Sequence, residues 1–227
     1  MTLLGRTRVK VCGITNIEDA RTCVEAGADA LGFIFVENTP RFVTPEQVAP
    51  IVQRLPPFIT PVGVFWDHPA GHVKAVIEAC GLRAVQFHGD EKPEDCQGYS
   101  VPVIKTIKLP PASTIDGLPE YRVAERFGAF LYRKVVAAYL LDSQARWSEG
   151  EGREPLEWRG IRLMADMQPR DARLPIVLSG GLTPENVATA VNIVQPFAVD
   201  VNSGVEARPG KKDPQLVRRF IEAARRA

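Results

Sequence analysis

The sequence predicts an α/β protein, a single-domain (β/α)8 TIM barrel that extends over residues 1–227. Apolar strand-like runs alternate with helix-like segments along the chain, the order that produces a parallel sheet with crossover helices. The strand-like runs are apolar throughout, as expected when both faces of a sheet are covered. With 45% hydrophobic and 24% charged residues, the chain can build one sizeable core.

Eight strand and helix pairs follow one another along the sequence. The predicted strands occupy residues 8–14, 29–36, 59–66, 82–88, 101–109, 137–143, 174–181 and 197–204. The predicted helices occupy residues 15–27, 44–55, 69–81, 92–97, 117–128, 158–168, 183–194 and 213–226. The first helix has Thr15 and Asn16 as candidate N-caps and Gly27 as its end. Eight pairs fit a compact barrel. An open doubly wound sheet is the alternative, but its fingerprint G-x-G-x-x-G does not follow the first strand.

The balance of charges favours a small-molecule partner. Lys and Arg number 28 against 27 Asp and Glu, a net charge of +1, so we expect neither nucleic-acid nor membrane binding. No segment has the apolar length of a signal peptide core or a membrane span, so we expect a cytoplasmic protein. The four cysteines form no CxxC pair and are expected to be reduced. His68 and His72 lack an evident third ligand, so we expect no metal site.

Polar residues and glycines at the carboxyl ends of the predicted strands are the candidates for a functional site, because barrel active sites form there. This rule selects Cys12, Arg41, His88, Lys105, Asp142, Gly180, Gly181 and Asp200. The polar residues 144–158, rich in glycine and glutamate, are expected to form a long loop on the same face, or merely a surface excursion.

Two glycine-containing loops follow the last two predicted strands. The seventh strand ends in Gly180 and Gly181, and the eighth ends in Asn202, Ser203 and Gly204. Glycines let backbone N–H groups approach a phosphate closely, and barrels commonly bind phosphate at these loops. The glycines could serve only as caps and turns, but their occurrence on both loops favours a phosphate site.

Cys12 and Asp142 each end an apolar strand and could form an acid–base pair. A free cysteine often only packs, but a thiol at a strand end before a helix can have its pKa lowered and act as a base. Asp142 could cap the following loop or act as an acid at the barrel mouth. Position alone leaves these alternatives open.

Several motifs together resemble the phosphoribosylanthranilate isomerase family of tryptophan biosynthesis. They are VKVCGITN, ADALGFIFVENTPRFVTPEQ, VGVF, VQFHGDE, VIKTIKL, LLDS, LSGGLTPENV and VDVNSGVEARPGKKD. The resemblance implies an Amadori rearrangement of N-(5-phosphoribosyl)anthranilate to 1-(2-carboxyphenylamino)-1-deoxyribulose 5-phosphate. It implies a phosphorylated small-molecule substrate and no metal or other cofactor, and we expect a monomer or homodimer.

The resemblance also implies roles for individual residues. Cys12 matches the general base and Asp142 the general acid. Arg41 matches the residue that meets the anthranilate carboxylate, although it could instead form a surface ion pair with Glu37. The remaining matches are the substrate-binding residues Lys10, His88 and Asp200 and the phosphate-binding residues Gly180, Gly181, Asn202, Ser203 and Gly204.

The chain departs from the family pattern in three places. Thr39 and Asn202 stand where serine is usual, and both keep hydrogen-bonding capacity. In residues 144–158, the usual G-G-T-G run is replaced by a stretch whose glycines are Gly150 and Gly152. Two other interpretations remain: a lyase similar to the tryptophan synthase α subunit, which would be expected to use carboxylates at early strand ends, and a non-catalytic phosphate-binding barrel.

Overall fold

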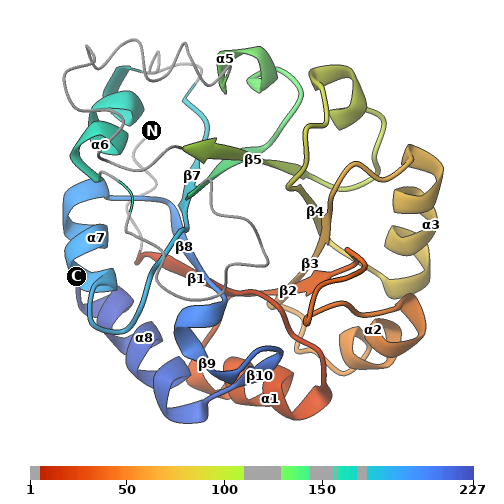
Figure 1. Ribbon diagram of the computed structural model, residues 1–227, viewed down its shortest axis with the longest axis horizontal. Coiled ribbons are helices and arrows are strands. Elements are labelled where there is room, and N and C mark those ends of the chain that lie inside the picture. Colours follow the sequence, from red (N-terminus) through yellow and green to blue (C-terminus); the bar gives the residue numbers. More distant parts are fainter. Residues whose placement is uncertain (1–5, 110–128, 144–155, 157, 168–172) are drawn as a thin grey trace.

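The computed structural model describes residues 6–109, 129–143, 156, 158–167 and 173–227. Eight parallel strands close into a barrel in sequence order, with β1 paired to both β2 and β8 (Figure 1). The strands are β1 (Arg8–Val11), β2 (Ala30–Ile34), β3 (Thr60–Phe65), β4 (Ala84–Phe87), β5 (Val103–Leu109), β6 (Ala138–Ser143), β7 (Ile176–Leu178) and β8 (Ala198–Val201). The predicted fold class is confirmed.

Helices form the outer layer of the barrel (Figure 1). The α-helices are α1 (Ile17–Ala26), α2 (Pro45–Val52), α3 (Ala70–Cys80), α5 (Ala129–Tyr132), α6 (Trp158–Met167), α7 (Val187–Val194) and α8 (Pro214–Arg226). Two short 3-10 helices, η1 (Pro93–Cys96) and η3 (Ser203–Val205), follow β4 and β8.

The ends of α1 form as the sequence predicts. The Asn16 side chain accepts a hydrogen bond from the Asp19 backbone N–H at 2.9 Å, and Gly27 ends the helix with a φ of 99°. Thr15, the other candidate cap, instead donates its hydroxyl to the Gly210 carbonyl at 2.8 Å. The cap therefore fixes where the chain leaves β1 and turns into the helix.

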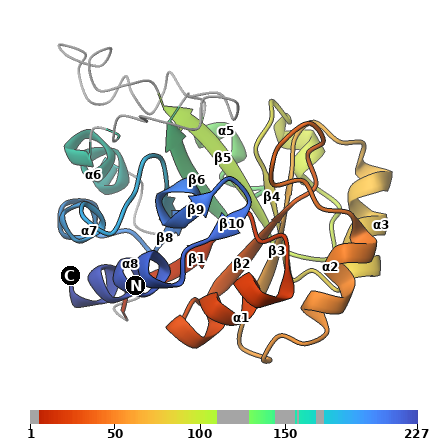
Figure 2. The same ribbon diagram turned by 60° about the horizontal axis from the view of Figure 1, so that its bottom comes forward.

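Residues 206–212 form a feature that the sequence did not predict. They make an antiparallel hairpin, β9 (Glu206–Arg208) and β10 (Lys211–Lys212), which lies above α1 in Figure 2. Gly210 occupies its turn with a φ of 78°, a conformation that favours glycine. The predicted helix over residues 117–128 and most of the predicted loop over residues 144–158 lie outside the described residues.

Apolar side chains fill the barrel below the carboxyl ends of its strands. Leu140, Val177 and Ala198 form one cluster inside the ring, one layer below Asp142 and Asp200. Because side chains alternate along a strand, these two carboxylates follow apolar residues on the same inward face. The interior is thus a packed core that opens into polar groups only at its mouth.

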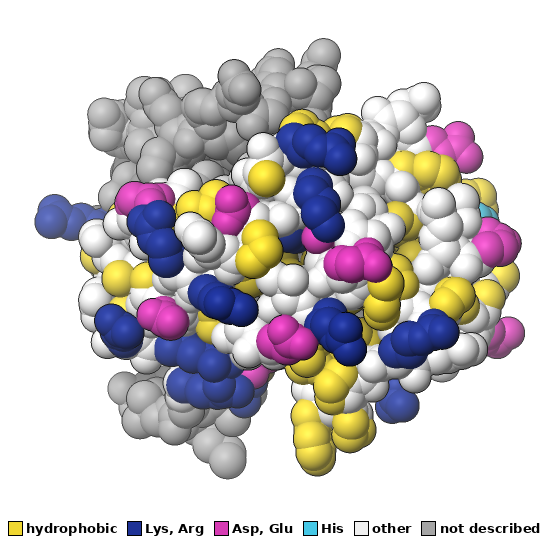
Figure 3. All heavy atoms as spheres, turned by 90° about the horizontal axis from the view of Figure 1, so that it is seen from below, with side chains coloured by type: hydrophobic (Ala, Val, Ile, Leu, Met, Phe, Trp, Pro, Cys, Tyr) yellow, Lys and Arg dark blue, Asp and Glu magenta, His cyan; other side chains and the backbone are white. Residues whose placement is uncertain are grey.

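Charges of both signs share the flank of the barrel that is lowest in Figure 1. Figure 3 shows Lys and Arg side chains interspersed with Asp and Glu side chains on this flank. Within the described ranges, no helix combines the length and apolar character needed to cross a membrane.

Candidate active site

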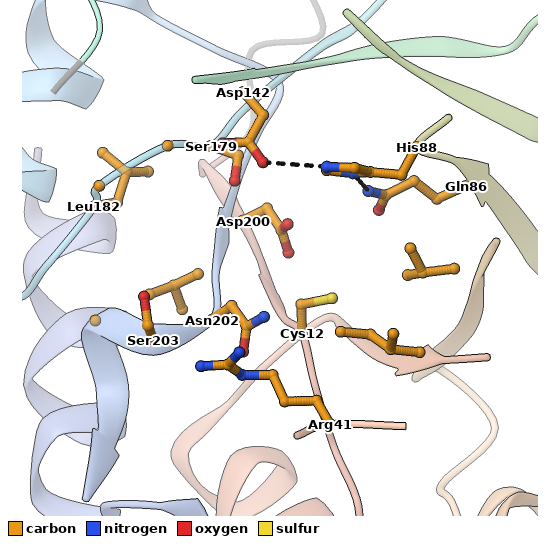
Figure 4. Close-up of a pocket in the computed structure, with 16 residues that line it drawn as sticks. Cys12, Arg41, Gln86, His88, Asp142, Ser179, Leu182, Asp200, Asn202 and Ser203 are labelled. Carbon is orange, nitrogen blue, oxygen red and sulfur yellow. Dashed lines mark hydrogen bonds and ion pairs between the residues drawn. The ribbon is translucent and has the colours of Figure 1, made fainter. Parts of the chain in front are cut away.

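A pocket opens at the carboxyl ends of the strands, inside the ring (Figure 4). Its lining residues are Cys12, Ile34, Arg41, Val64, Gln86, His88, Asp142, Ser179, Gly180, Gly181, Leu182, Asp200, Val201, Asn202, Ser203 and Gly204. The fold therefore brings together all but two of the candidates selected from the sequence. The two exceptions are buried: Lys10 lies on β1 behind the pocket wall, and Lys105 lies on β5, with its ammonium group against the loop after β4.

Cys12 lies directly beyond β1, with its side chain packed against Ile34 and Val64 and only 5% exposed. Gly32 on the neighbouring strand makes room for it. A Cβ atom at position 32 would lie 2.6 Å from the Cys12 Sγ and 3.1 Å from the Lys10 Nζ, closer than packed atoms approach. The thiol is thus both a packing group and a wall of the pocket.

Burial raises the pKa of the Cys12 thiol above its ordinary value of 9.0, and the Asp200 carboxylate adds to the rise, while the ammonium groups of Lys10 and Lys212 oppose it. The sequence left open a lowered thiol pKa at this strand end, and the structure gives the opposite direction. The position of Cys12 in the sequence suggested an electropositive helix start, but the apolar packing of the thiol outweighs the neighbouring cations.

Lys10 and Asp200 form a buried ion pair beside the thiol. The Lys10 Nζ donates to the Asp200 Oδ1 at 2.8 Å, and the two side chains are 5% and 6% exposed. Burial alone would lower the pKa of Lys10, but Asp200 and Cys12 raise it above its ordinary 10.5. The ammonium therefore stays charged behind the pocket wall, whereas Asp200 faces the pocket itself (Figure 4).

Asp142, on β6, and His88, just beyond β4, face each other across the pocket (Figure 4). The His88 Nε2 lies 3.7 Å from the Asp142 Oδ2. The Asp142 Oδ1 accepts a hydrogen bond from the Ser143 backbone N–H at 2.8 Å. The carboxylate thus caps the start of the following loop and also faces the pocket, so the cap does not remove it from the site.

Arg41 is held by a partner that lies far away in the sequence. Its Nε and Nη2 donate to the two carboxylate oxygens of Glu206, at 2.9 and 2.6 Å, and Arg41 is 7% exposed. Lys212, on β10, donates to the same carboxylate at 3.0 Å. The partner of Arg41 is therefore the buried Glu206 of the hairpin rather than Glu37 on the surface. Two cations share one carboxylate here, which leaves a net positive charge beside the pocket.

These charges shift the pKa values of their neighbours. Burial would raise the pKa of Glu206, but hydrogen bonds from Arg41 and Lys212 hold it below its usual range. Burial lowers the pKa of Lys212, and Glu206 only partly restores it. Glu206 is therefore ionised at neutral pH and fixes the Arg41 fork at the pocket edge.

The loops after β7 and β8 meet at one side of the pocket. Gly180 and Gly181 have φ values of 83° and 67°, in the region that favours glycine. A Cβ atom on Gly204 would lie 2.0 Å from the Leu182 carbonyl oxygen, so only glycine allows the two loops to pack this closely. The first hydrogen bond of η3 runs from the Val205 N–H to the Asn202 carbonyl at 3.4 Å, which leaves earlier N–H groups for other acceptors.

Four residues at or near the site were not predicted from the sequence: Gln86, Ser179, Glu206 and Lys212. Gln86 and Ser179 line the pocket directly. Strand alternation could have found Gln86, because it precedes His88 by two residues and therefore shares its inward face. No comparable signal was available for Glu206 and Lys212, whose hairpin was not predicted.

Within the described residues, no group of three or more His, Cys, Asp or Glu side chains is arranged to hold a metal ion. His68 and His72 stack their rings with centroids 5.2 Å apart, and the His68 Nδ1 accepts from the Trp66 backbone N–H at 3.2 Å. These contacts give the two histidines a structural explanation outside the pocket.

The fold and the pocket together define a class, the (β/α)8-barrel enzymes that place their active sites at the carboxyl ends of the strands. Within this class the family is clear: residues 9–223 match the family model described as N-(5'phosphoribosyl)anthranilate (PRA) isomerase. The chain belongs to this family.

Individual proteins support this assignment. The N-(5'-phosphoribosyl)anthranilate isomerase of Pelobacter propionicus is 44% identical over 218 residues, which cover 96% of this chain and 95% of that protein. The crystal structure of phosphoribosyl anthranilate isomerase from Thermotoga maritima is 41% identical with a TM-score of 0.84, covering 97% of this chain and 100% of the other. A second isomerase structure holds reduced 1-(o-carboxyphenylamino)-1-deoxyribulose 5-phosphate; it is 40% identical with a TM-score of 0.79, at the same coverage.

Proposed function

We propose that this chain catalyses the Amadori rearrangement of N-(5-phosphoribosyl)anthranilate to 1-(2-carboxyphenylamino)-1-deoxyribulose 5-phosphate, with Cys12 as general base and Asp142 as general acid. The observation that carries the proposal is the convergence of a thiol, a carboxylate and two glycine loops in one pocket. The family supplies the substrate class, because a relative of the same fold binds a reduced form of this product.

In this proposal the substrate phosphate binds at the loops after β7 and β8. Gly180, Gly181, Ser203 and Gly204 offer backbone N–H groups to the phosphate oxygens, and Asn202 offers its side chain. Their position on one wall leaves the ribose to extend towards Cys12 and Asp142.

Arg41 receives the anthranilate carboxylate. Glu206 engages its Nε and Nη2, and in the part of the chain that the structure describes no hydrogen bond engages Nη1. The second cation, Lys212, offsets the charge of Glu206, so the guanidinium keeps its attraction for an anion.

Asp142 opens the ribose ring. In its protonated form it donates a proton to the ring oxygen, the bond between this oxygen and C1 breaks, and a protonated imine remains. The imine nitrogen is then the electron sink for the next step, so no redox group is required by this chemistry.

Cys12 then removes the proton at C2, and the electron pair of that bond forms the C1–C2 double bond of an enolamine, which tautomerises to the ketone. A thiol with a raised pKa is mostly protonated at rest. The positive imine that forms beside it, together with the Lys10 ammonium, favours the thiolate. The thiolate is therefore most populated when the proton at C2 is most acidic.

A fluorescence assay that follows loss of N-(5-phosphoribosyl)anthranilate tests the function directly. We expect the purified chain to consume the substrate and to release the ribulose product. A folded protein that binds the reduced product analogue but does not convert the substrate would support the non-catalytic barrel. A folded protein that neither binds the analogue nor converts the substrate would favour the lyase. The expectation of a monomer or homodimer stays a prediction, which light scattering on the same sample decides.

A further inference from the structure

Gln86 is a buried pocket residue, and only the nitrogen of its side-chain amide has hydrogen-bonding neighbours among the described residues. It lies on β4, is 2% exposed and lines the pocket. Its Nε2 is 3.2 Å from the His88 Nδ1 and 3.2 Å from the Thr106 Oγ1. Its Oε1 is buried and, among the residues that the structure describes, has no hydrogen-bond partner. The two ends of one amide therefore need separate explanations.

The Nε2 end determines where His88 carries its proton. An amide Nε2 is only a donor, with two protons for its two neighbours. It can donate to the His88 Nδ1 only if that nitrogen is unprotonated, and the proton of the neutral ring then sits on Nε2. This is the nitrogen that faces the Asp142 Oδ2, at 3.7 Å. Gln86 thus directs the histidine proton towards Asp142.

The Oε1 end points to a ligand. Buried carbonyl oxygens in native proteins nearly always accept a hydrogen bond, and those that do not need a specific explanation. Figure 4 shows Gln86 opposite the loops after β7 and β8, with Asp142, Asp200 and Cys12 around the space that the Gln86 amide faces. A group bound in that space must present a donor to satisfy the oxygen.

We propose that Gln86 binds the nitrogen of the substrate through its Oε1 while its Nε2 keeps His88 in the Nε2–H form facing Asp142. The first half rests on the proposed function, which brings the N–H on C1 between Cys12 and Asp142. This N–H becomes positively charged when the imine forms and is neutral before it. A fixed carbonyl oxygen therefore stabilises the transition state for ring opening more than the bound substrate.

Gln86→Leu removes both contacts at nearly unchanged volume. We expect kcat to fall on the order of tenfold to a hundredfold, with KM changed far less, because the lost interaction is strongest in the transition state. Gln86→Met is a second variant of similar shape that keeps the test open if the leucine variant fails to fold.

Thr106→Val is the matched control. The Thr106 Oγ1 lies 3.2 Å from the same two atoms, Gln86 Nε2 and His88 Nδ1, but Thr106 does not line the pocket. If Gln86 acts on the substrate, the valine variant keeps kcat within a few-fold of wild type. An equal loss in both variants would mean that the cluster only packs, and it would overturn the substrate contact.

Nitrogen-15 NMR of the histidine rings tests the second half without any turnover. The chain has 3 histidines, and the His88 signals are identified by their loss in His88→Gln. We expect wild-type His88 to show a protonated Nε2 and an unprotonated Nδ1, and we expect Gln86→Glu to move the proton to Nδ1. A wild-type ring with its proton on Nδ1 would overturn the tautomer assignment.

The outcomes also separate this inference from the proposed function. If wild type fails to convert N-(5-phosphoribosyl)anthranilate, the substrate contact falls with the function, while the NMR result still decides the tautomer. If wild type is active and Gln86→Leu and Gln86→Met retain its kcat and KM, the function stands and the inference on Gln86 is overturned.

Discussion

Two buried lysine–carboxylate pairs of the barrel have nearly the same geometry. The Lys10 Nζ is 2.8 Å from the Asp200 Oδ1, and the Lys105 Nζ is 2.7 Å from the Glu91 Oε2. None of the four side chains is more than 6% exposed. Burial and distance alone therefore do not tell the two pairs apart.

The groups that surround the two pairs differ. The Lys105 Nζ also donates to the Gly89 carbonyl at 2.7 Å, and the Glu91 Oε1 accepts from the backbone N–H groups of Asp67 and Gly89. That pair holds the loops after β3 and β4. The Lys10 pair lies against the Cys12 thiol and faces the pocket through Asp200. Two buried ion pairs of the same length are therefore distinguished by their contacts: one holds loops, and the other lies at the pocket.

Lys10→Met is expected to have a larger effect on catalysis than the corresponding change at Lys105, because it acts on both stability and chemistry. It removes the cation that lowers the thiol pKa and leaves the Asp200 carboxylate unpaired beside the thiol, which raises this pKa further. A higher thiol pKa lowers the thiolate fraction, so we expect kcat/KM to fall by about tenfold or more near neutral pH, where a tenfold change corresponds to about 1.4 kcal/mol. The increase of kcat/KM with pH should occur at higher pH in Lys10→Met than in wild type. A pH profile of kcat/KM with unchanged shape would contradict this role.

Lys105→Met provides the other half of the comparison. It leaves Glu91 as an unpaired buried charge, a change that typically destabilises a protein by about 3–5 kcal/mol. We expect the free energy of unfolding in urea to fall by this order, while kcat of the folded protein stays near wild type. A large loss of kcat without loss of stability would place this pair with the chemistry instead.

Arg41→Ala tests a third buried ion pair, one at the pocket edge. The loss of a charge-assisted hydrogen bond to the substrate carboxylate predicts a rise in KM equivalent to about 1.5–3 kcal/mol. Arg41→Lys should recover only part of this loss, because an ammonium group cannot reproduce the two-pronged geometry. Normal kinetics in Arg41→Ala would show that the arginine serves only its pair with Glu206.

The smallest effect near neutral pH is expected for Cys23, a buried thiol on α1 that does not line the pocket. Burial raises its pKa to about 12, from an ordinary 9.0. Above pH 9 the unfolded chain loses this proton while the folded chain keeps it, so stability falls as pH rises from about 9 to 12. The slope is at most about 1.4 kcal/mol per pH unit. The free energy of unfolding, measured by urea titration at several pH values, should fall more steeply with pH for wild type than for Cys23→Ala. The same dependence on pH in both proteins would contradict the raised pKa of Cys23.

The sequence predicts the barrel well, because apolar runs and helix caps are local signals. Asn16 and Gly27 mark α1, and the strand-end rule selects Cys12, His88 and Asp142 by their positions in the chain alone. The hairpin of residues 206–212 escapes prediction, since its strands are short, polar and without alternation. The partner of Arg41 escapes with it, because Glu206 lies 165 residues away in the chain.

The direction of the Cys12 pKa shows a second limit of the sequence. The sequence indicates that the thiol stands before a helix, but it does not indicate that Ile34 and Val64 pack against the sulfur. Desolvation of the thiol raises its pKa by more than the nearby cations lower it. Strand alternation indicates that Gln86 shares the inward face of His88, but it does not indicate which atoms the Gln86 amide contacts.

Cys12→Ser tests most directly whether the Cys12 thiol removes the proton at C2. Stopped-flow fluorescence gives kcat, and a titration with reduced 1-(o-carboxyphenylamino)-1-deoxyribulose 5-phosphate gives the Kd of the same variant. Serine is close in size but is a far poorer base, so we expect kcat to fall by about 10²- to 10⁴-fold while the Kd stays near wild type. A folded Cys12→Ser variant with near-normal kcat would mean that another group removes this proton.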